Sequence, residues 1–152
     1  MRDMDVVEYT IRVGDGGVKK ERKGVRPDGY FVIADKQRLS RGLLARARFL
    51  LELDGSTYDN PRFGREKVVP GIAYIKSKEY KTRFGDNSGR WLVVTTGEQR
   101  MMNMKRQAET VGGKGAGIFY FTSLDKISSE TVLDTPIWYR GGDNYPRPLF
   151  NV

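Results

Sequence analysis

The chain has 152 residues, about the length of one domain, and a formal net charge of +8. It contains no His and no Cys. This composition excludes a Ser-His-Asp or Cys-His nucleophile system, a Cys/His zinc site, a disulfide within the chain, and a nuclease site whose metal is held by paired histidines. Catalysis would therefore rest on carboxylates, Lys, Arg, Tyr or hydroxyl groups, with a hard cation such as Mg²⁺ as the natural cofactor.

The first part of the chain predicts three strands separated by loops. Residues 6–13 are β-branched and partly alternating, and a basic, Gly-rich loop is expected to follow them up to residue 24. Residues 30–34 predict a short buried strand behind the breaker Arg-Pro-Asp-Gly, and residues 35–42 predict a turn or hairpin loop. Residues 43–54 alternate at first and then become continuously apolar, as expected of a strand that enters the core.

The remainder predicts helices alternating with strands. Residues 63–84 have apolar residues at helical spacing, and Pro70 and Gly71 predict a kink or a late helix start. The later expected elements are a strand at 91–95, a helix at about 97–111 capped by Thr96, a loop at 112–117, a strand at 117–123, a helical turn at 123–128 and a short edge strand ending at residue 140. This order predicts an α/β or α+β fold, with a mixed central sheet flanked by helices.

The positive charge is concentrated in the middle of the chain. Residues 11–120 carry +11, whereas residues 1–10 carry −2 and residues 121–152 carry −1. A basic middle segment predicts a polyanionic partner, with DNA first, and a basic surface that only favours solubility is the plain alternative. The sequence has neither a signal-peptide pattern nor an apolar run long enough for a membrane span. We therefore expect a cytoplasmic protein that does not bind membranes.

Three acidic residues stand out because of their positions relative to the predicted strands. Asp28 opens the strand at 30–34, and Glu52 and Asp54 lie two residues apart at the end of the next strand, where side chains at i and i+2 share a face. If these strands pair, the carboxylates meet and favour a divalent cation, Mg²⁺ or Mn²⁺, which can activate water against a phosphodiester. Taken alone, Asp28 in Pro-Asp-Gly favours a turn, and Asp54 is equally suited to cap the loop that follows it.

The sequence Pro27-Asp28, followed on the next strand by Glu52-Leu53-Asp54, resembles the core of the PD-(D/E)XK nuclease superfamily, which has the restriction-endonuclease-like fold. The resemblance implies that Asp28 and Glu52 bind the metal while a lysine orients the attacking water. Asp54 stands where that lysine is expected, and the resemblance implies that Lys67, on the following element, takes over its role.

A broader resemblance covers about residues 25–150. The segments RPDGYFVI, FLLELDGST, RFGREK, RWLVVTTGEQRMMNMKRQAE and PIWY resemble the replication-relaxation family of plasmid and mobile-element proteins. That family typically has a winged helix-turn-helix ahead of a nuclease-like domain, and residues 1–24 are too short for one. The resemblance implies a nuclease-like domain at 25–152, with 1–24 as its N-terminal strand and basic loop. Either this domain acts alone, or its DNA-reading part lies in a separate replication partner.

Basic side chains near the acids predict the DNA contacts. The basic loop close to Asp28 is expected to clamp the DNA backbone. Two arginines of the strand at 43–54 alternate on one face and are expected to contact DNA as well. The predicted nucleic-acid-binding residues are Lys19, Lys20, Lys23, Arg26, Arg46 and Arg48. A solvated loop and a solvent-facing strand are the plain alternatives. The Gly-rich segment at 112–117 lacks the GK[ST] of a phosphate loop and leads into a strand, so it does not predict a nucleotide site.

Two functions follow from these patterns. The first is a metal-dependent nuclease-like domain that acts on the DNA of a mobile element, with Asp28, Glu52 and Lys67 as its catalytic residues. The second is a catalytically inactive DNA- or protein-binding module on the same fold, which the displaced lysine favours. Binding to DNA that weakens with salt is expected for both, and only the first predicts that Glu52→Ala abolishes cleavage.

Overall fold

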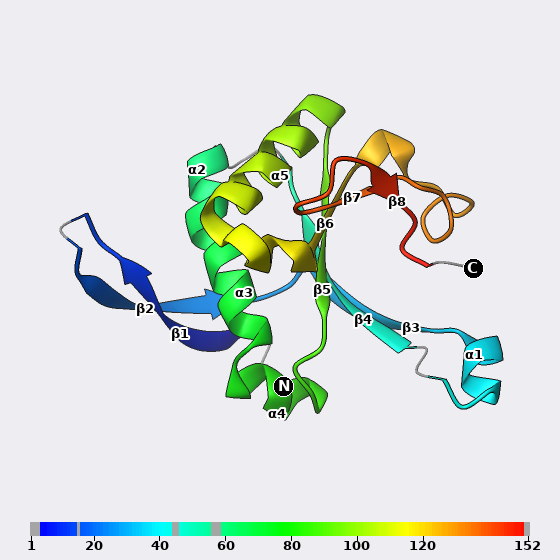
Figure 1. Cartoon of the computed structure of the whole chain (residues 1–152), viewed down its shortest axis with the longest axis horizontal. Helices are drawn as coiled ribbons and strands as arrows, with labels where there is room; N and C mark the ends of the chain where they lie inside the picture. Colours follow the sequence, from blue (N-terminus) through cyan, green and yellow to red (C-terminus); the bar gives the residue numbers. More distant parts are fainter. Residues whose placement is uncertain (1–3, 15, 44–45, 56–58, 151–152) are drawn as a thin grey trace.

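The computed structural model describes residues 4–14, 16–43, 46–55 and 59–150, which form two β-sheets with helices packed on the larger one (Figure 1). The smaller sheet is an antiparallel hairpin of β1 (Asp5–Arg12) and β2 (Val18–Val25). The larger sheet has six strands in the order β3-β4-β5-β6-β7-β8. The predicted fold class, a mixed central sheet flanked by helices, is confirmed.

The larger sheet is mixed, and its strands follow one another in space as they do in the chain. They are β3 (Gly29–Ala34), β4 (Arg46–Leu53), β5 (Arg90–Thr95), β6 (Phe119–Ser123), β7 (Trp138–Arg140) and β8 (Pro146–Arg147). β4, β5 and β6 are parallel, and every other neighbouring pair is antiparallel. Parallel neighbours need a crossover connection, so helices join β4 to β5 and β5 to β6. The carboxyl ends of these three strands consequently meet at one edge of the sheet.

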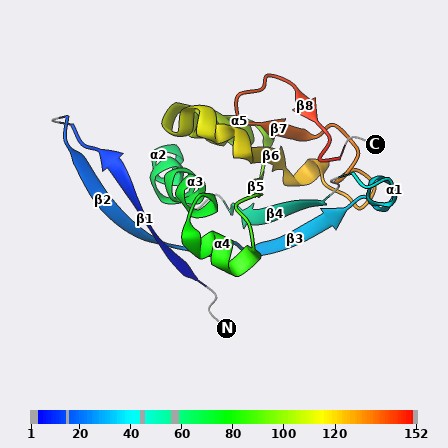
Figure 2. The ribbon, with the colours of Figure 1, turned by 60° about the horizontal axis from the view of Figure 1, so that its bottom comes forward.

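The crossover helices cover one face of the larger sheet (Figure 2). Between β4 and β5 lie α2 (Asn60–Phe63), the π-helical turn η1 (Gly64–Val68), α3 (Val69–Ile75) and α4 (Lys78–Phe84). Between β5 and β6 lie α5 (Glu98–Gly112) and the 3₁₀ turn η2 (Gly113–Ile118). Their apolar side chains, such as Phe63 and Met104, pack against Leu50, Val93 and Phe121 of the sheet. No helix in the described part of the chain is long and apolar enough to cross a membrane.

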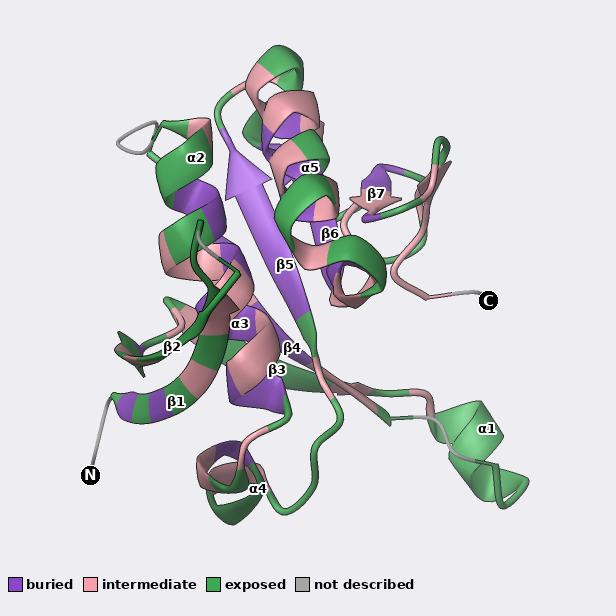
Figure 3. Ribbon diagram, turned by 60° about the vertical axis from the view of Figure 1, so that its left-hand side comes forward, coloured by how far each residue is buried: buried purple, intermediate pink, exposed green. Residues whose placement is uncertain are grey.

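The opposite face of the sheet is covered by C-terminal segments instead of long helices. Phe49, Leu92 and Tyr120 form a second buried cluster with Ile137 and Trp138. The 3₁₀ turn η3 (Leu124–Lys126) follows β6, and the short helix α1 (Lys36–Ser40) lies between β3 and β4. β5 is buried along most of its length as a result (Figure 3).

Two predictions about the first part of the chain are wrong. The segment predicted as a basic loop contains β2, which pairs along its whole length with β1. Its charged residues gave no apolar signal, because most of this strand is solvent-exposed. The strand at 30–34 exists as β3, but it is largely exposed, with Val32 53% accessible. β3 lies at the edge of the larger sheet, so one side of it has no neighbouring strand to cover it.

The predicted helix at 63–84 is divided in the structure. The prediction of a disturbance at Pro70 is confirmed, because a π-helical turn precedes α3 and the backbone N–H of Val69 donates to Gly64. Proline offers no backbone donor of its own, which favours such an irregularity. At Gly71 the helix approaches the sheet so closely that a Cβ atom would lie 3.1 Å from Trp91 and Phe119. A second break follows where Ser77 caps α4.

Three smaller expectations near the C-terminal half also need correction. The helix predicted at 97–111 is α5, but its N-cap is Gly97 and not Thr96. The segment at 112–117, predicted as a loop, contains the last residue of α5 and most of the 3₁₀ turn η2. The strand ending at residue 140 is β7, and it is not the edge because β8 pairs with it on the outer side. The strands predicted at 91–95 and 117–123 are confirmed as β5 and β6.

The β1–β2 hairpin is attached to the helices at its base. Val7 and Val25 belong to the main core cluster, and Asp5 is buried beside them. The Asp5 carboxylate accepts a 2.6 Å hydrogen bond from the Tyr74 hydroxyl and another of 2.6 Å from Nε of Arg83. Burial and the Asp5 charge raise the pKa of Tyr74 well above its usual value. These contacts fix the hairpin to α3 and α4, while its far end projects from the body of the molecule (Figure 1).

Candidate functional site

Glu52 lies near the carboxyl end of β4, in the middle of an apolar surface. It stands opposite Val93 of β5 and shares the helix-covered face of the sheet with Leu50. Only 7% of its surface is accessible. An acidic side chain in such a place costs free energy unless a partner compensates its charge, so its presence needs a specific explanation.

Lys67 of η1 is the basic partner of Glu52. Its Nζ atom lies 3.2 Å from Oε1 of Glu52. The π-helical turn carries Lys67 to this position, and π-helical turns occur frequently at functional sites. At Gly64, the first residue of this turn, a Cβ atom would lie 2.7 Å from the Gln107 side chain, so the turn packs closely on α5. The structure thus brings Lys67 to Glu52.

Asp28 lies beside the same end of β4. Its backbone N–H donates to the carbonyl of Leu51 at 2.8 Å, and its Oδ2 atom accepts from the backbone N–H of Leu53 at 2.7 Å. The antiparallel register pairs Gly29 with Leu51, so one further step places Asp28 across from Glu52. The sheet therefore brings the two acids predicted as metal ligands together.

The charges of this cluster act on one another. Burial raises the pKa of Glu52 above its usual value, and the Lys67 ammonium opposes that rise, whereas the charges of Asp28 and Asp54 reinforce it. Burial dominates, so the Glu52 carboxylate holds its proton more tightly than an exposed glutamate does. A carboxylate with this environment gains from any further positive charge that comes near it.

A small cavity of about 30 Å³ lies at Glu52 and Lys67, with Arg26, Phe63 and Trp91 also in its wall. A cavity of this size holds one or two water molecules when polar groups line it. Arg26 also borders a neighbouring pocket of about 190 Å³ that contains Asp28. Glu52, Glu66, Lys67 and Arg26 therefore surround space in which a water molecule fits, and Asp28 lines the neighbouring pocket.

Asp54 was predicted as a third metal ligand, but its carboxylate has other partners. Its Oδ2 atom accepts from the Thr95 hydroxyl and from Nε of Arg100, each at 2.5 Å, and its Oδ1 atom accepts from Arg100 at 3.0 Å. Its side chain is 2% exposed. This bidentate pair ties α5 to the end of β4. Among the described residues, no three or more acidic side chains come close enough to hold one ion.

Two carboxylates nevertheless match the donor set of one hard cation. Mg²⁺ commonly binds through one or two protein carboxylates and keeps several of its waters. Asp28 and Glu52 offer these oxygens, and the adjacent cavity offers room for water. The carboxylates of Asp28 and Glu52 therefore suit Mg²⁺ or Mn²⁺, whereas both oxygens of Asp54 already accept hydrogen bonds from Thr95 or Arg100.

The predicted nucleic-acid-binding residues of the hairpin lie on β2. Lys19 forms an ion pair with Glu21 at 3.3 Å, and Lys23 forms one with Glu66 of η1 at 3.6 Å. Lys20 is exposed and lies opposite Thr10. Because i and i+2 share a face, Lys20 points away from the face that carries Lys19 and Lys23. These residues therefore form two faces of the hairpin and not one clamp.

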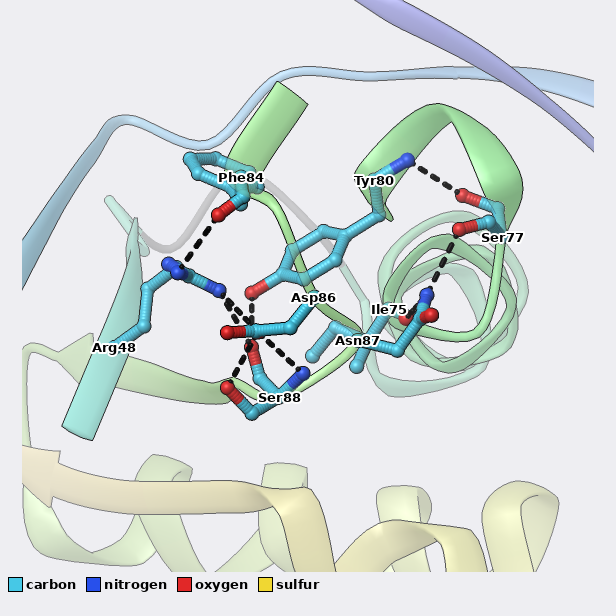
Figure 4. A network of polar contacts seen from close by, with 8 residues as sticks. All are labelled: Arg48, Ile75, Ser77, Tyr80, Phe84, Asp86, Asn87 and Ser88. Atoms are coloured by element: carbon cyan, nitrogen blue, oxygen red, sulfur yellow. Dashed lines mark hydrogen bonds and ion pairs between the residues drawn. The ribbon is translucent and has the colours of Figure 1, made fainter. Parts of the chain in front are cut away.

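Arg48 was predicted as a DNA contact, but its guanidinium is enclosed by the protein (Figure 4). It donates to Asp86 at 2.8 Å and to the carbonyl oxygens of Ser88 and Phe84 at 3.0 Å, and it lies over the Phe84 and Tyr80 rings. Its side chain is only 14% exposed. The Arg48 guanidinium also holds the pKa of Asp86 well below its usual range. Arg48 therefore fixes the loop before β5, whereas Arg46 is exposed at the start of β4.

The pKa of Glu52 predicts a measurable effect on stability. The folded protein keeps the Glu52 proton to a higher pH than the unfolded chain does, so the free energy of unfolding falls as the pH rises through this range. Glu52→Gln carries no ionising group, and we expect it to be more stable than the wild type at neutral pH. The difference should disappear towards about pH 4, where the unfolded carboxyl is protonated as well.

Thermal unfolding measured from acidic to neutral pH tests this expectation. Glu130→Gln serves as the control, because Glu130 is exposed, and its melting temperature should follow that of the wild type. A Glu52→Gln variant less stable than the wild type at neutral pH would mean that the Lys67 ion pair outweighs the effect of burial, and the expected sign would then be wrong.

Comparison with protein families, with curated proteins and with solved structures finds no match for this chain.

Proposed function

We propose that this protein is a metal-dependent nuclease-like domain that hydrolyses phosphodiester bonds in DNA. The observation that supports it most is the buried Glu52 carboxylate, which has Lys67 at 3.2 Å and lies beside Asp28 and a water-sized cavity. A buried acid with a raised pKa and a charged partner in a cavity is typical of functional sites. The proposal includes the PD-(D/E)XK-like core and the relation to replication-relaxation proteins of mobile elements.

The chemistry follows from the residues present. Asp28 and Glu52 would hold Mg²⁺ or Mn²⁺, which supplies a water of lowered pKa and positive charge for the phosphate under attack. The Lys67 ammonium, at the wall of the cavity, orients the attacking water. The water oxygen bonds to phosphorus, the ester P–O bond breaks, and the water proton passes to the departing oxygen. Arg26 borders the cavity and is suited to hold a non-bridging phosphate oxygen.

The charge of the chain supports DNA as the substrate. The +11 of residues 11–120 includes the basic hairpin and the residues around Glu52, and such a surface attracts a polyanion. Lys20 and Arg26 are available for phosphate contacts, since neither forms an ion pair with a described residue. Recognition of a particular DNA sequence is assigned in this proposal to a separate DNA-reading or replication partner in the cytoplasm.

Cleavage of supercoiled plasmid with Mg²⁺ or Mn²⁺ tests the proposed function. The wild type is expected to cleave, and Glu52→Gln and Asp28→Asn are expected to lose cleavage and metal binding by calorimetry. Glu130→Gln and Asp134→Asn are matched controls at exposed positions, and both should behave as the wild type. A wild type that neither cleaves nor binds either metal contradicts the proposal.

A second candidate is a catalytically inactive DNA- or protein-binding module. The Lys67 ion pair favours it, because a protein cation already compensates the Glu52 charge. The pairing of Asp54 with Arg100 also favours the inactive module, because the Asp54 carboxylate is then not available as a metal ligand. This candidate predicts salt-sensitive DNA binding that is unchanged in Glu52→Gln and is not accompanied by cleavage.

A further inference from the structure

An open groove of about 600 Å³ lies at the opposite end of the larger sheet from Glu52. It is bordered by the amino ends of the parallel strands β4 and β5, by α1 and by the C-terminal segment, which lie at the same end of the molecule (Figure 1). Four arginines from these four elements line it, together with two tyrosines. They are Arg38, Arg46, Arg90, Arg147, Tyr120 and Tyr145.

The positive charge of this arginine groove is only partly compensated. Arg147 forms a 2.5 Å ion pair with Asp143, and Arg38 lies 3.9 Å from Asp35. Arg46 and Arg90 form no ion pair with any residue that the structure describes. Within the described part of the chain, no acidic side chain lines the groove. Two uncompensated guanidinium groups that line the same groove favour an anionic ligand.

A second groove adjoins the first. It has a volume of about 780 Å³ and is also lined by Arg46 and Arg90, so the two grooves meet at these arginines. The acid of the second groove, Asp86, is already bound by Arg48 at 2.8 Å. Two adjoining basic grooves fit a polymer with repeated negative charges better than they fit a single small anion.

Aromatic rings accompany the arginines. The Arg147 guanidinium lies 5.6 Å from the centre of the Tyr145 ring, and that of Arg90 lies 5.8 Å from the Tyr120 ring. Tyr145 is 59% exposed, so one face of its ring is accessible. Exposed aromatic rings beside arginines stack with unpaired bases, a contact that a closed duplex does not offer.

We propose that the arginine groove binds single-stranded nucleic acid through its phosphodiester backbone. This inference rests on the proposed function for the class of ligand, which is nucleic acid. It does not depend on whether the protein cleaves that ligand. Arg46 and Glu52 lie at opposite ends of one strand, roughly 20 Å apart at about 3.3 Å per residue. A strand held in the groove is therefore bound well away from the carboxylate site, by residues that cleavage does not use.

Fluorescence anisotropy with a labelled oligothymidylate of about 20 nucleotides in EDTA tests this proposal. Arg46→Ala/Arg90→Ala is expected to bind roughly tenfold to a hundredfold more weakly than the wild type at low salt. The slope of log affinity against log salt should become shallower by about 1.4, because each phosphate contact to a single strand contributes about 0.7. The control Arg106→Ala/Lys114→Ala removes the same charge from exposed positions that do not line the groove, and it should retain wild-type affinity.

Three results would overturn the proposal. In the first, the groove variant keeps the affinity and salt dependence of the wild type. In the second, thymidine monophosphate displaces the oligonucleotide at micromolar concentration, which defines a mononucleotide site. In the third, duplex of the same length binds more tightly and depends equally on Arg46 and Arg90. Suppose that the groove variant binds more weakly in EDTA, and that in the separate plasmid assay the wild type neither cleaves nor binds Mg²⁺ or Mn²⁺. These two results would support the groove and contradict the nuclease independently.

Discussion

Lys67→Met is expected to lower the rate of DNA cleavage about 10²–10³-fold, the range found when a charge-stabilising donor is removed from an active site. Lys67 forms an ion pair with Glu52 at 3.2 Å, and it lies in the wall of the cavity proposed to hold the attacking water. Lys67→Arg should recover part of the rate, because it restores a positive donor on a longer side chain. Cleavage kinetics at saturating Mg²⁺ measure both variants.

The pH dependence of the same variants separates a catalytic role from a structural one. Lys67 opposes the rise in the pKa of Glu52, so its removal is expected to raise that pKa further. The acidic limb of the residual cleavage profile should then move towards higher pH. Lys76→Met, at an exposed position after α3, is the matched control and should change neither the rate nor the profile. An unshifted profile in an otherwise well-folded Lys67→Met would contradict the assigned role.

Arg100→Met is expected to lower the free energy of unfolding by about 3–5 kcal/mol, the usual cost of removing one partner of a buried ion pair. The Asp54 carboxylate that remains is 2% exposed and loses both of its guanidinium hydrogen bonds. Replacing the acid as well, in Asp54→Asn/Arg100→Met, should restore part of that stability, since a neutral side chain is left in the same place. Denaturation in urea measures the series.

Arg106→Met, on the exposed side of α5, is the control for this series and should stay within about 0.5 kcal/mol of the wild type. Metal binding adds a second test. If Asp54 acts only through Arg100, Asp54→Asn should reduce the affinity for Mg²⁺ far less than Glu52→Gln does. An equal loss of affinity in the two variants would restore Asp54 to the set of metal ligands.

The meeting of Asp28 and Glu52 could be predicted because it depends only on local rules. Strands that follow one another in the chain usually pair with each other, and the i, i+2 rule places Glu52 on a defined face. Lys67 was accessible only through the family resemblance. The contact of Lys67 with Glu52 depends on the π-helical turn η1. The residues of η1 show no pattern that distinguishes this turn from an ordinary helix.

The partners of Asp54 and Arg48 could not be predicted from the sequence. Arg100 follows Asp54 by 46 residues, and Asp86 follows Arg48 by 38, so each pair forms only after the larger sheet and its crossovers are assembled. From the sequence alone, a charged side chain on a strand could face solvent, contact DNA or pair with an acid that is distant in the chain. The exposure of β3 depends in the same way on its place at the sheet edge, which its residues do not encode.

The attachment of the β1–β2 hairpin has a mechanical consequence. Asp5, Val7 and Val25 fix one end, with Tyr9 packed against the core and Lys23 paired with Glu66. Beyond Tyr9, none of the described residues of β1 belongs to the core cluster. At about 3.3 Å per residue, a rotation of about 10° at the base displaces the far end by roughly 4 Å. Any repacking of the base against α3 and α4 would therefore be amplified at the far end, and the basic side chains of β2 would be displaced with it.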